Sequence, residues 1–527
     1  MTIRTDFVIA PDHPFIGLDA MSILSRQLPR RASHPCLVWG TPEFERTWTY
    51  ETFVADVEST AAGLSERGVG EGTPVLVHLE NSPAFLMVWF ACARLGAVAV
   101  DVNARSSLDE LRHAIDLTGT TAVVTNDPHV ASEIGDGAWS LVVNPDIGIA
   151  TDLFGDASKL TVRAPDPTKA VCIQFTSGST SRPKAVLYSH ANALWGARES
   201  AEHWGLEEDD VQLVFAPLFH TLALYWQTLS TLWVGGTVVL QSKFSISQFW
   251  DVSKRHECTR TTYMPLLRHV VGTQPVPVHR YRSWIAGAQE SSVQTLFDVD
   301  LFSTWGMTEV VTQPIFALSG DGADEGDIGF PARHYEIRVR RDDGELADAD
   351  DSGELLVRGE RGVSLFCEYF GDAATTAAAF DAEGFFRTGD RVKVQTSGAL
   401  AFVDRSKDML KVGGENVAAS EIERVVLATP GVGEAAVVGR SDVALSEVPV
   451  AFVIAMGDDA PVDLSARVIE HCAAMLADFK VPRAVYIVDE FPRAINKVHK
   501  ARLRAHANAL RQFDVESGRL DRYPDSQ

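Results

Sequence analysis

A chain of 527 residues is too long for a single ordinary core, so the sequence predicts two or more domains. Its 47 basic and 71 acidic side chains leave a net charge of −24, which disfavours nonspecific binding to nucleic acid or to an anionic membrane. Any polyanionic ligand must therefore meet a local positive patch. The 6 cysteines are scattered without a CxxC pair, which indicates buried thiols in a reducing, cytoplasmic compartment.

The N-terminal segment, residues 1–15, contains acidic residues and prolines where a secretion signal has basic and then apolar residues, so no export signal is predicted. The longest apolar stretch, residues 84–100, is interrupted by Arg94 and Gly96. We expect it to form a helix, a turn and a strand rather than a membrane span. Pro83 and Gly96 mark the two ends of that helix.

Helix and strand patterns alternate through the first two thirds of the chain, which predicts α/β layering. From Asp327 onward, short apolar runs separated by Asp-Gly and Ser-Gly turns indicate a small β subdomain. After Lys407 the pattern returns to mixed helices and strands. The strands expected before Asp327 cover residues 75–79, 97–102, 122–125, 141–143, 211–215, 237–240 and 284–286.

One loop of unusual composition follows the apolar residues 171–175. It reads Thr176-Ser177-Gly178-Ser179-Thr180-Ser181-Arg182-Pro183-Lys184. Gly178 lets the backbone approach an anion, the hydroxyl and N–H groups donate to its oxygens, and Lys184 supplies a mobile positive charge. Pro183 occupies the place where a Walker A loop needs its second glycine. A short strand and a helix capped by Ser189 are expected next. The loop predicts phosphate binding, and a solvated serine-rich turn is the alternative.

This loop resembles the phosphate loop of the adenylate-forming superfamily, which includes acyl-CoA synthetases, the adenylation domains of peptide synthetases and the beetle luciferases. Ala185 stands where that family usually has glycine. Each further motif is weak alone, but their order along almost the whole chain is specific. These segments are Pro217-Leu218-Phe219-His220, Ala286-Gly287-Ala288-Gln289, Ser303-Thr304-Trp305-Gly306-Met307-Thr308-Glu309, Gly384-Phe385-Phe386-Arg387-Thr388-Gly389-Asp390, Asp404-Arg405-Ser406-Lys407-Asp408, Lys411-Val412-Gly413-Gly414-Glu415-Asn416-Val417 and Pro492-Arg493-Ala494-Ile495-Asn496-Lys497-Val498.

The resemblance implies a nucleotide site. Trp305, in place of the usual tyrosine, would cover adenine, and Asp390 would accept both ribose hydroxyls because a carboxylate has two acceptor oxygens. Gly413 and Gly414 would line the pantetheine tunnel of CoA. The ligand-binding residues implied in this way are Thr176, Ser177, Gly178, Ser179, Thr180, Lys184, Gly287, Ala288, Gln289, Thr304, Trp305, Asp390, Arg405, Gly413 and Gly414.

The resemblance also implies catalytic roles. Thr308 would contact the α-phosphate and Glu309 would bind Mg²⁺, while His220 would lie beside the acyl substrate. Lys497 would bridge the substrate carboxylate and the α-phosphate, which is electrostatic stabilisation. Asn496 stands where the family has glycine before this lysine, and asparagine tolerates left-handed geometry. Taken singly, a strand-end histidine and a glutamate after threonine are more often structural.

The implied fold class is α/β, with a large N-terminal region of layered α/β subdomains plus a β subdomain, and a small mobile C-terminal α+β domain. The N-terminal adenylate-forming domain would cover residues 1–403, and a hinge at 404–407 would include Lys407. The C-terminal lid domain would cover residues 408–527.

The implied function is an ATP-dependent acid:CoA ligase, with ATP and Mg²⁺ as cofactors and CoA as co-substrate. A carboxylic acid and MgATP would give acyl-AMP and pyrophosphate, and the CoA thiol would then displace AMP. Within the superfamily, the residues of these motifs resemble those of the crotonobetaine/carnitine CoA ligases and related small-acid ligases. Trp195, Phe219, Tyr225 and Trp226 flank the expected acyl pocket, and their bulk favours a small or aromatic acid, with a plain aromatic core as the alternative.

Two other functions stay open. The same adenylation could serve a carrier protein, or a diazotase that activates nitrite for an aryl amine. The chain could also be an inactive nucleotide-binding relative, as Ala185 and Asn496 suggest, although Lys184, Glu309, Asp390 and Lys497 are intact. No nucleic-acid partner and no membrane span are expected, and the oligomeric state is open, with a homodimer among the options.

Overall fold

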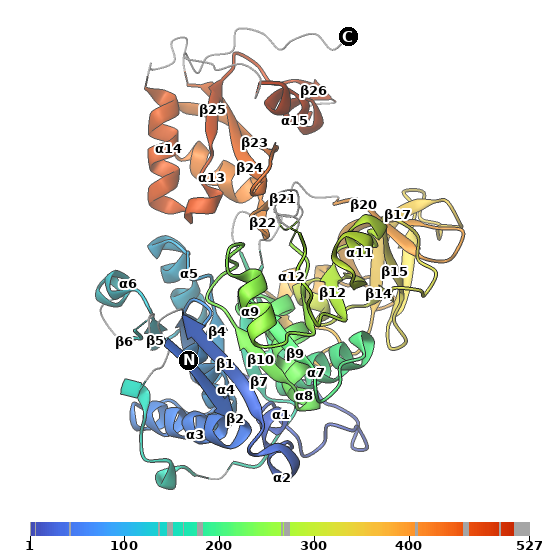
Figure 1. Cartoon of the computed structure of the whole chain (residues 1–527). Coiled ribbons are helices and arrows are strands. Elements are labelled where there is room, and N and C mark those ends of the chain that lie inside the picture. Colours follow the sequence, from blue (N-terminus) through green and yellow to red (C-terminus); the bar gives the residue numbers. More distant parts are fainter. Residues whose placement is uncertain are drawn as a thin grey trace. The chain divides into compact units, whose positions relative to one another are not determined.

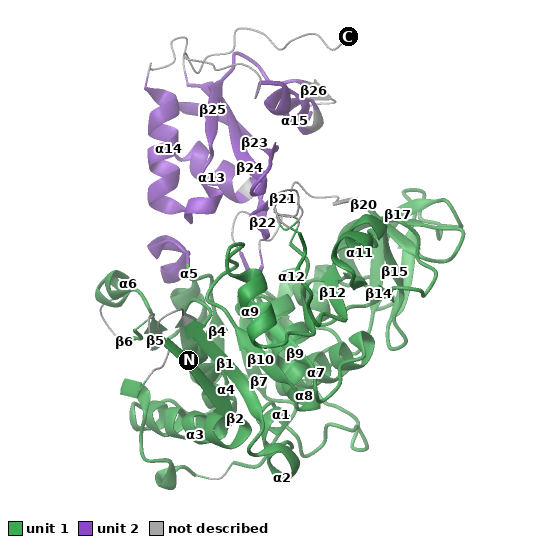
Figure 2. Cartoon of the chain, viewed as in Figure 1, with its two compact units in different colours: residues 1–104, 114–175, 185–404 green, residues 105–113, 176–184, 405–527 purple. Residues whose placement is uncertain are grey.

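A computed structural model describes residues 2–5, 7–41, 44–134, 138–144, 151–161, 163–176, 183–264, 267, 275–405, 409–456, 463–494 and 497–510. The chain divides into two compact units, coloured green and purple in Figure 2. Unit 1 comprises residues 1–104, 114–175 and 185–404, and unit 2 comprises residues 105–113, 176–184 and 405–527.

The first sheet of unit 1 has seven strands and a parallel centre. Its strands β4, β5, β6 and β7 are labelled in Figure 1. Strands β7, β4, β3, β5 and β6 pair in that order and run in the same direction. Every residue of β3, β4 and β5 is buried, as expected for a parallel sheet covered on both faces. The strand bounds are β3 Pro74–His78, β4 Val98–Asp101, β5 Ala122–Thr125, β6 Trp139–Val142, β7 Ala170–Thr176, β8 Lys184–Ser189 and β18 Glu368–Tyr369.

The second sheet of unit 1 has thirteen strands and changes character along its width. Strands β1, β10, β9, β11, β12 and β13 are parallel neighbours. The pairings from β14 through β15 to β20, and among β19, β17 and β16, are antiparallel. The strand bounds are β1 Pro35–Thr41, β2 Phe44–Thr49, β9 Val211–Val214, β10 Thr237–Leu240, β11 Arg260–Thr262, β12 Ser283–Ala286, β13 Asp300–Trp305, β14 Ile315–Leu318, β15 Asp327–Pro331, β16 Glu336–Arg340, β17 Ser352–Arg358, β19 Phe386–Val394 and β20 Leu400–Arg405.

Both ends of helix α4, Pro83–Leu95, are determined by local capping residues. The Ser82 side chain accepts a hydrogen bond from the N–H of Phe85, and Pro83 occupies the first turn. Gly96 ends the helix at φ +67°, a conformation that costs glycine little. Residues 83–93 are all buried, and the helix packs on α3, β3 and β4. The predicted helix, turn and strand over residues 84–100 are therefore confirmed.

The other described helices lie around these sheets. The helix α5 Leu108–Thr118 contributes to both units. The remaining helices and turns of unit 1 are α1 Ser22–Ser25, α2 Leu28–Arg31, α3 Tyr50–Glu66, α6 Pro128–Glu133, α7 His190–Trp204, α8 Ser230–Val234, α9 Phe249–Arg255, α11 Ser291–Phe297, α12 Ala373–Ala378, a π-helix Leu222–Leu229 and 3₁₀ turns Thr151–Leu153, Ala157–Lys159 and Thr308–Val310.

Unit 2 is a small mixed domain with its own core. Strands β22, β21, β24 and β23 form an antiparallel sheet, and β25 pairs with β24 in parallel. The bounds are β21 Met409–Val412, β22 Glu415–Ala418, α13 Ala419–Leu427, β23 Val432–Asp442, β24 Ser446–Ala455, α14 Leu464–Met475, the 3₁₀ turn Asp478–Lys480, β25 Ala484–Ile487, β26 Arg493–Ala494, β27 Lys497–Val498 and α15 Lys500–Ala509. These two units confirm the predicted α/β fold class with a small C-terminal α+β part.

Two further expectations concern membrane-spanning helices and the state of the cysteines. In the part of the chain that the structure describes, no helix has the length and apolar character needed to cross a membrane. All 6 cysteines are buried and unpaired with one another, as predicted for thiols in a core.

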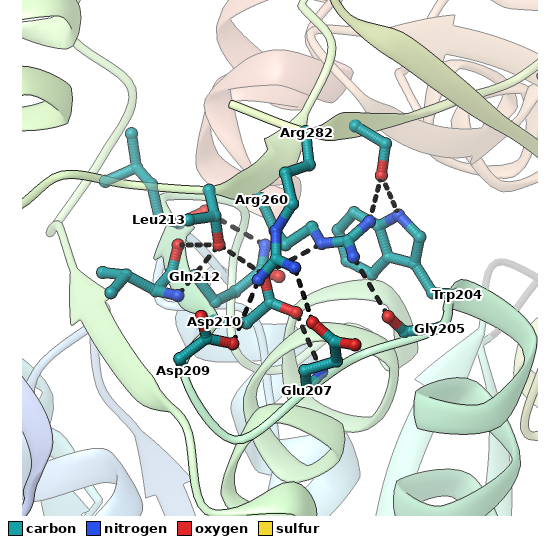
Figure 3. A network of polar contacts seen from close by, with 12 residues as sticks. Trp204, Gly205, Glu207, Asp209, Asp210, Gln212, Leu213, Arg260 and Arg282 are labelled. Carbon is teal, nitrogen blue, oxygen red and sulfur yellow. Dashed lines mark hydrogen bonds and ion pairs between the residues drawn. The ribbon is translucent and has the colours of Figure 1, made fainter. Parts of the chain in front are cut away.

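A buried ion network joins the amino ends of three neighbouring parallel strands (Figure 3). The carboxylate of Asp210, which precedes β9 and is fully buried, accepts hydrogen bonds from Arg260 Nε at 3.1 Å and from Arg282 Nη2 at 2.7 Å. Arg260, the first residue of β11, also donates to the hydroxyl of Ser283 and the carbonyl of Gly205. Ser283 begins β12. The network therefore ties β9, β11 and β12 together at one edge of the sheet.

We expect Asp210→Ala to lower the free energy of unfolding by about 3–5 kcal/mol, because it leaves the buried Arg260 guanidinium without its carboxylate. Asp209→Ala is the matched control, since Asp209 also pairs with Arg282, at 3.3 Å, but its side chain is 77% exposed. That control should cost less than about 1 kcal/mol. Urea midpoints of unit 1 unfolding measure both, and equal shifts would contradict a structural role for the buried network.

Candidate functional site

The predicted motifs of unit 1 follow the carboxyl ends of neighbouring parallel strands. His220 lies after β9, Gly287 directly follows β12, and Thr308 and Glu309 come shortly after β13. Strands β13, β12, β11 and β9 are adjacent in that order. In open α/β sheets, ligands bind at this edge. The topology therefore gathers segments that are widely separated in sequence on the side of the sheet opposite the Asp210 network.

Trp305 and Asp390 form a direct pair. The indole Nε1–H of Trp305 donates to Asp390 Oδ2 at 2.9 Å, and both side chains are buried. The backbone N–H of Asp390 donates to the hydroxyl of Thr388, which itself donates to the Leu355 carbonyl. The carboxylate predicted to accept ribose is thus fixed in direction by the ring predicted to cover adenine.

The segment after β12 has an open end and a buried end. Gly287 is exposed, and a Cβ added there would meet no atom within 4 Å. The side-chain amide of Gln289 instead donates to the Ser303 hydroxyl at 2.9 Å and to the Ala317 carbonyl at 3.2 Å. Gln289 therefore braces β13 and β14 with its side chain, while Gly287 and the half-buried Ala288 lie on the accessible side. The hydroxyl of Thr304 similarly donates within the sheet, to the Ile315 carbonyl at 3.1 Å.

Glu309 is a buried carboxylate at the start of the turn after β13. Its Oε1 accepts a hydrogen bond from the Tyr369 hydroxyl at 2.8 Å. Burial, and then the charge of Glu309, raise the pKa of Tyr369 and keep it a donor. Among the described residues, no group of three His, Cys, Asp or Glu side chains could hold a metal ion. A single carboxylate fits Mg²⁺ that is bound mainly through nucleotide phosphates and water.

The segment of His220 is fixed by a residue that the sequence did not single out. Asn81 donates from its amide to the Ala216 carbonyl at 2.8 Å and accepts from the N–H of Leu218 at 2.8 Å. His220 is half-buried, and its ring centroid lies 4.5 Å from that of Phe219. Asn81 follows β3 closely, so the segment after β3 holds the loop after β9 in place.

Of the four aromatic residues predicted to flank the acyl pocket, Phe219 is half-buried beside His220, and the other three are of two kinds. Tyr225 is fully buried and packs its ring against Trp89 and Tyr188, so it is plain core, as the alternative prediction held. Trp226 and Trp195 instead donate their indole N–H groups, to the Val311 carbonyl at 2.8 Å and to the Tyr335 hydroxyl at 3.0 Å. Trp226 therefore contacts the turn that follows Glu309 directly, and Trp195 contacts it through Tyr335.

Several predicted residues are only partly visible or lie elsewhere. Thr176 ends β7 and Lys184 begins β8, which agrees with the predicted strand, loop and strand. Gly413 and Gly414 form the turn between β21 and β22 of unit 2 with φ +60° and +91°. Only the backbone of Arg405 and Lys497 is described. The residues that lie outside the described part of the chain are Ser177, Gly178, Ser179, Thr180 and Lys407.

Comparison with known proteins identifies the family. The profile of AMP-binding enzymes matches residues 24–370. The chain belongs to the AMP-binding enzyme family. The profile of the AMP-binding enzyme C-terminal domain matches residues 421–497. The predicted superfamily is thereby confirmed, and the chain is a member of the AMP-forming acid–CoA ligases.

The chain is also similar to individual ligases and synthetases. The chain is 30% identical over 472 residues to the crotonobetaine/carnitine–CoA ligase of Salmonella paratyphi B, covering 85% of this chain and 91% of the relative. It is similar to the structure of a double mutant of o-succinylbenzoate CoA synthetase from Bacillus subtilis bound with a product analogue, at a TM-score of 0.82 and 25% identity, covering 92% and 97% of the two chains. The same synthetase in complex with ATP and a magnesium ion matches at a TM-score of 0.66 and 25% identity, covering 92% and 99%.

This AMP-binding enzyme has a buried carboxyl group in its seven-stranded sheet. Asp101 ends β4 and accepts a hydrogen bond from the Cys172 thiol at 3.1 Å. Beside it in the sheet, Gln174 accepts from the Thr221 hydroxyl at 2.9 Å. Burial raises the pKa of Asp101 to about 7. The sequence offered no signal for this group, because Asp101 occupies the end of an otherwise apolar strand.

Asp101→Asn should stabilise the protein above pH 7. The raised pKa means that the folded protein binds a proton between pH 4 and 7 where the unfolded chain does not, so stability falls as the pH rises through this range. The neutral amide removes that cost, which amounts to roughly 4 kcal/mol above pH 7. Urea midpoints at pH 4 to 8 test this, and a constant difference between variant and wild type would refute a buried titrating carboxyl.

Proposed function

We propose that this protein is an ATP-dependent acid:CoA ligase that acts through an acyl-adenylate on a small or aromatic carboxylic acid. The observation that carries the proposal is the hydrogen-bonded pair formed by Trp305 and Asp390. Thr308 and Glu309 follow Trp305 closely in the sequence. A flat ring, a ribose acceptor, a hydroxyl and a single carboxylate at the carboxyl edge of a parallel sheet suit a nucleotide with Mg²⁺ on its phosphates.

The chemistry has two steps. In the first, a carboxylate oxygen of the acid attacks the α-phosphorus, the bond to the bridging oxygen breaks, and pyrophosphate leaves with the electron pair. In the second, the CoA thiolate attacks the acyl carbon and AMP leaves, while the thiol proton passes to solvent. Bound Mg²⁺ would neutralise phosphate charge at Glu309. Lys497 would stabilise the charge between two anions, and Thr308 would orient the α-phosphate.

The expectation of a small acid is supported by Trp226 and Gly306. A Cβ added to Gly306 would lie 2.6 Å from Cζ2 of Trp226, so the indole fills the space directly beside this glycine. With the acyl group bound on that side of the motif, this bulk would favour a short chain. The names of two relatives, a crotonobetaine/carnitine–CoA ligase and an o-succinylbenzoate CoA synthetase, also favour short or aromatic acids.

Mass spectrometry of the products from ATP, Mg²⁺, CoA and a mixed acid library tests this function. We expect AMP, pyrophosphate and thioesters of small or aromatic acids. Lys497→Ala should lose pyrophosphate release by at least about a hundredfold, yet still convert added acyl-AMP and CoA to thioester. Lys500→Ala is the matched control, because Lys500 is a nearby lysine of unit 2 that pairs with Glu423 at 2.7 Å.

Other outcomes favour other functions. Best turnover with long fatty acids would rule out the short pocket. Products formed only with a carrier protein, or with nitrite and an aryl amine, would change the acceptor while keeping the adenylation. ATP binding without pyrophosphate release across the whole library would identify an inactive relative. Equal loss of both half-reactions in Lys497→Ala would contradict the role proposed for this lysine.

Trp305→Phe should weaken the recognition of ribose. Phenylalanine still covers a base but has no N–H for Asp390, so we expect kcat/KM for ATP to fall about tenfold. The preference for ATP over 2′-deoxy-ATP should shrink in the same variant, and Trp305→Tyr, which restores a polar ring edge, should recover part of it. An unchanged preference in both variants would mean that the indole does not orient the carboxylate.

A further inference from the structure

The turn after Glu309 is strained. Val311 has φ +61° and ψ −48°, and the N–H of Thr312 donates to the Val310 carbonyl at 2.6 Å. These values describe a γ-turn with positive φ, which is rare in proteins. A β-branched residue at positive φ is a genuine outlier, because its side chain crowds the backbone. Such a conformation persists only where the surrounding contacts determine it.

Every backbone carbonyl from Thr308 to Val311 accepts a hydrogen bond from outside the turn. Thr308 accepts from the Tyr188 hydroxyl. The Glu309 carbonyl accepts from the N–H of Phe366 at 2.9 Å. The Val310 carbonyl accepts from the Tyr335 hydroxyl at 3.0 Å, and the Val311 carbonyl from the Trp226 indole at 2.8 Å. The four donors come from different parts of unit 1.

Trp226 contacts the turn and the motif at once. It belongs to the π-helix Leu222–Leu229, an element that is rare and frequent at functional sites. Its six-membered ring lies against Gly306, where an added Cβ would be 2.6 Å from Cζ2 and 2.6 Å from the Thr312 carbonyl. The indole is 7% exposed. The Trp226 side chain therefore packs against Gly306, before Thr308, and also holds the Val311 carbonyl.

Tyr335 has a comparable position on the other side of the turn. Its hydroxyl accepts a hydrogen bond from the Trp195 indole at 3.0 Å and pairs with the Thr312 hydroxyl at 2.7 Å. Its own hydrogen has two carbonyl acceptors within reach, Val310 at 3.0 Å and Ser364 at 3.2 Å. Burial raises the pKa of Tyr335, which keeps the phenol protonated and able to donate. The phenol thus joins both ends of the strained turn.

We propose that Trp226 and Tyr335 are positioning residues for adenylation: they keep the Val311 turn in its strained form and thereby aim Thr308 and Glu309 at the nucleotide phosphates. This inference rests on the proposed function, since it assigns phosphate and Mg²⁺ contacts to those two side chains. Pre-organised contacts are most valuable where charge develops on a transferring group. The first half-reaction depends on both contacts, whereas thioester formation keeps only the contact of Thr308, because acyl-AMP retains the α-phosphate but neither pyrophosphate nor its metal ion.

Trp226→Phe and Tyr335→Phe test the proposal, each removing a polar hydrogen while keeping an aromatic ring. We expect pyrophosphate release to fall at least about tenfold and the Mg²⁺ concentration for half-maximal rate to rise. Conversion of added acyl-AMP and CoA to thioester should fall by a smaller factor than pyrophosphate release in both variants, because it does not use the Mg²⁺ contact of Glu309. Independently of turnover, the gain in ATP affinity that Mg²⁺ gives over EDTA should shrink in both variants, measured by isothermal titration calorimetry.

Trp204→Phe is the matched control. Trp204 is a buried tryptophan of the same unit whose indole donates to the Ser283 hydroxyl at 2.7 Å, at the opposite edge of the sheet. It should keep the wild-type ratio of the two half-reactions and the wild-type Mg²⁺ dependence. An equal loss of both half-reactions in the Trp226 and Tyr335 variants, or an unchanged Mg²⁺ dependence, would overturn the proposal. If wild type itself releases no pyrophosphate, the proposed function fails, and the calorimetry still decides whether the turn positions a metal contact.

Discussion

The register of the parallel strands β9, β11, β12 and β13 is the constraint on which the rest of the site depends. These strands are short, from the three residues of Arg260–Thr262 to the six of Asp300–Trp305. At one edge, Asp210 fixes the amino ends of β9, β11 and β12 through Arg260 and Arg282. A one-residue slip there would turn each following segment toward the wrong face. The buried ion network thus helps to set the register that places the segments at the other edge.

At the carboxyl edge, position is determined mainly by hydrogen bonds to backbone carbonyls. Thr308 and Glu309 lie in a 3₁₀ turn of only three residues, which cannot fix its own direction. Its stability comes from donors on surrounding elements, with Tyr335 and Trp226 at its end. Since the whole chain is strongly acidic, a polyanion gains little from long-range attraction here. Under the proposed function, local geometry around the strained turn must therefore supply the binding energy for the phosphates.

The sequence predicted features whose signals are local. The ends of α4 follow from Ser82, Pro83 and Gly96, and the motifs appear where β12 and β13 end. It did not predict the contact between Trp305 and Asp390, which are 85 positions apart, nor Asn81 beneath the His220 segment. Such partners follow from strand order, which no local pattern encodes. The roles of the phosphate loop and of the hinge stay predictions.

The substitutions relative to the family differ in their physical cost. Ala185 lies inside β8, is 2% exposed and does not adopt a positive φ; its carbonyl accepts a hydrogen bond from the N–H of Phe370 at 2.7 Å. A methyl group is therefore compatible with this backbone, and Ala185 gives no reason to expect an inactive protein. Trp305 in place of tyrosine even supplies a donor to Asp390. The case for an inactive relative is then left to Asn496, whose asparagine side chain is one of the few that tolerate the left-handed region.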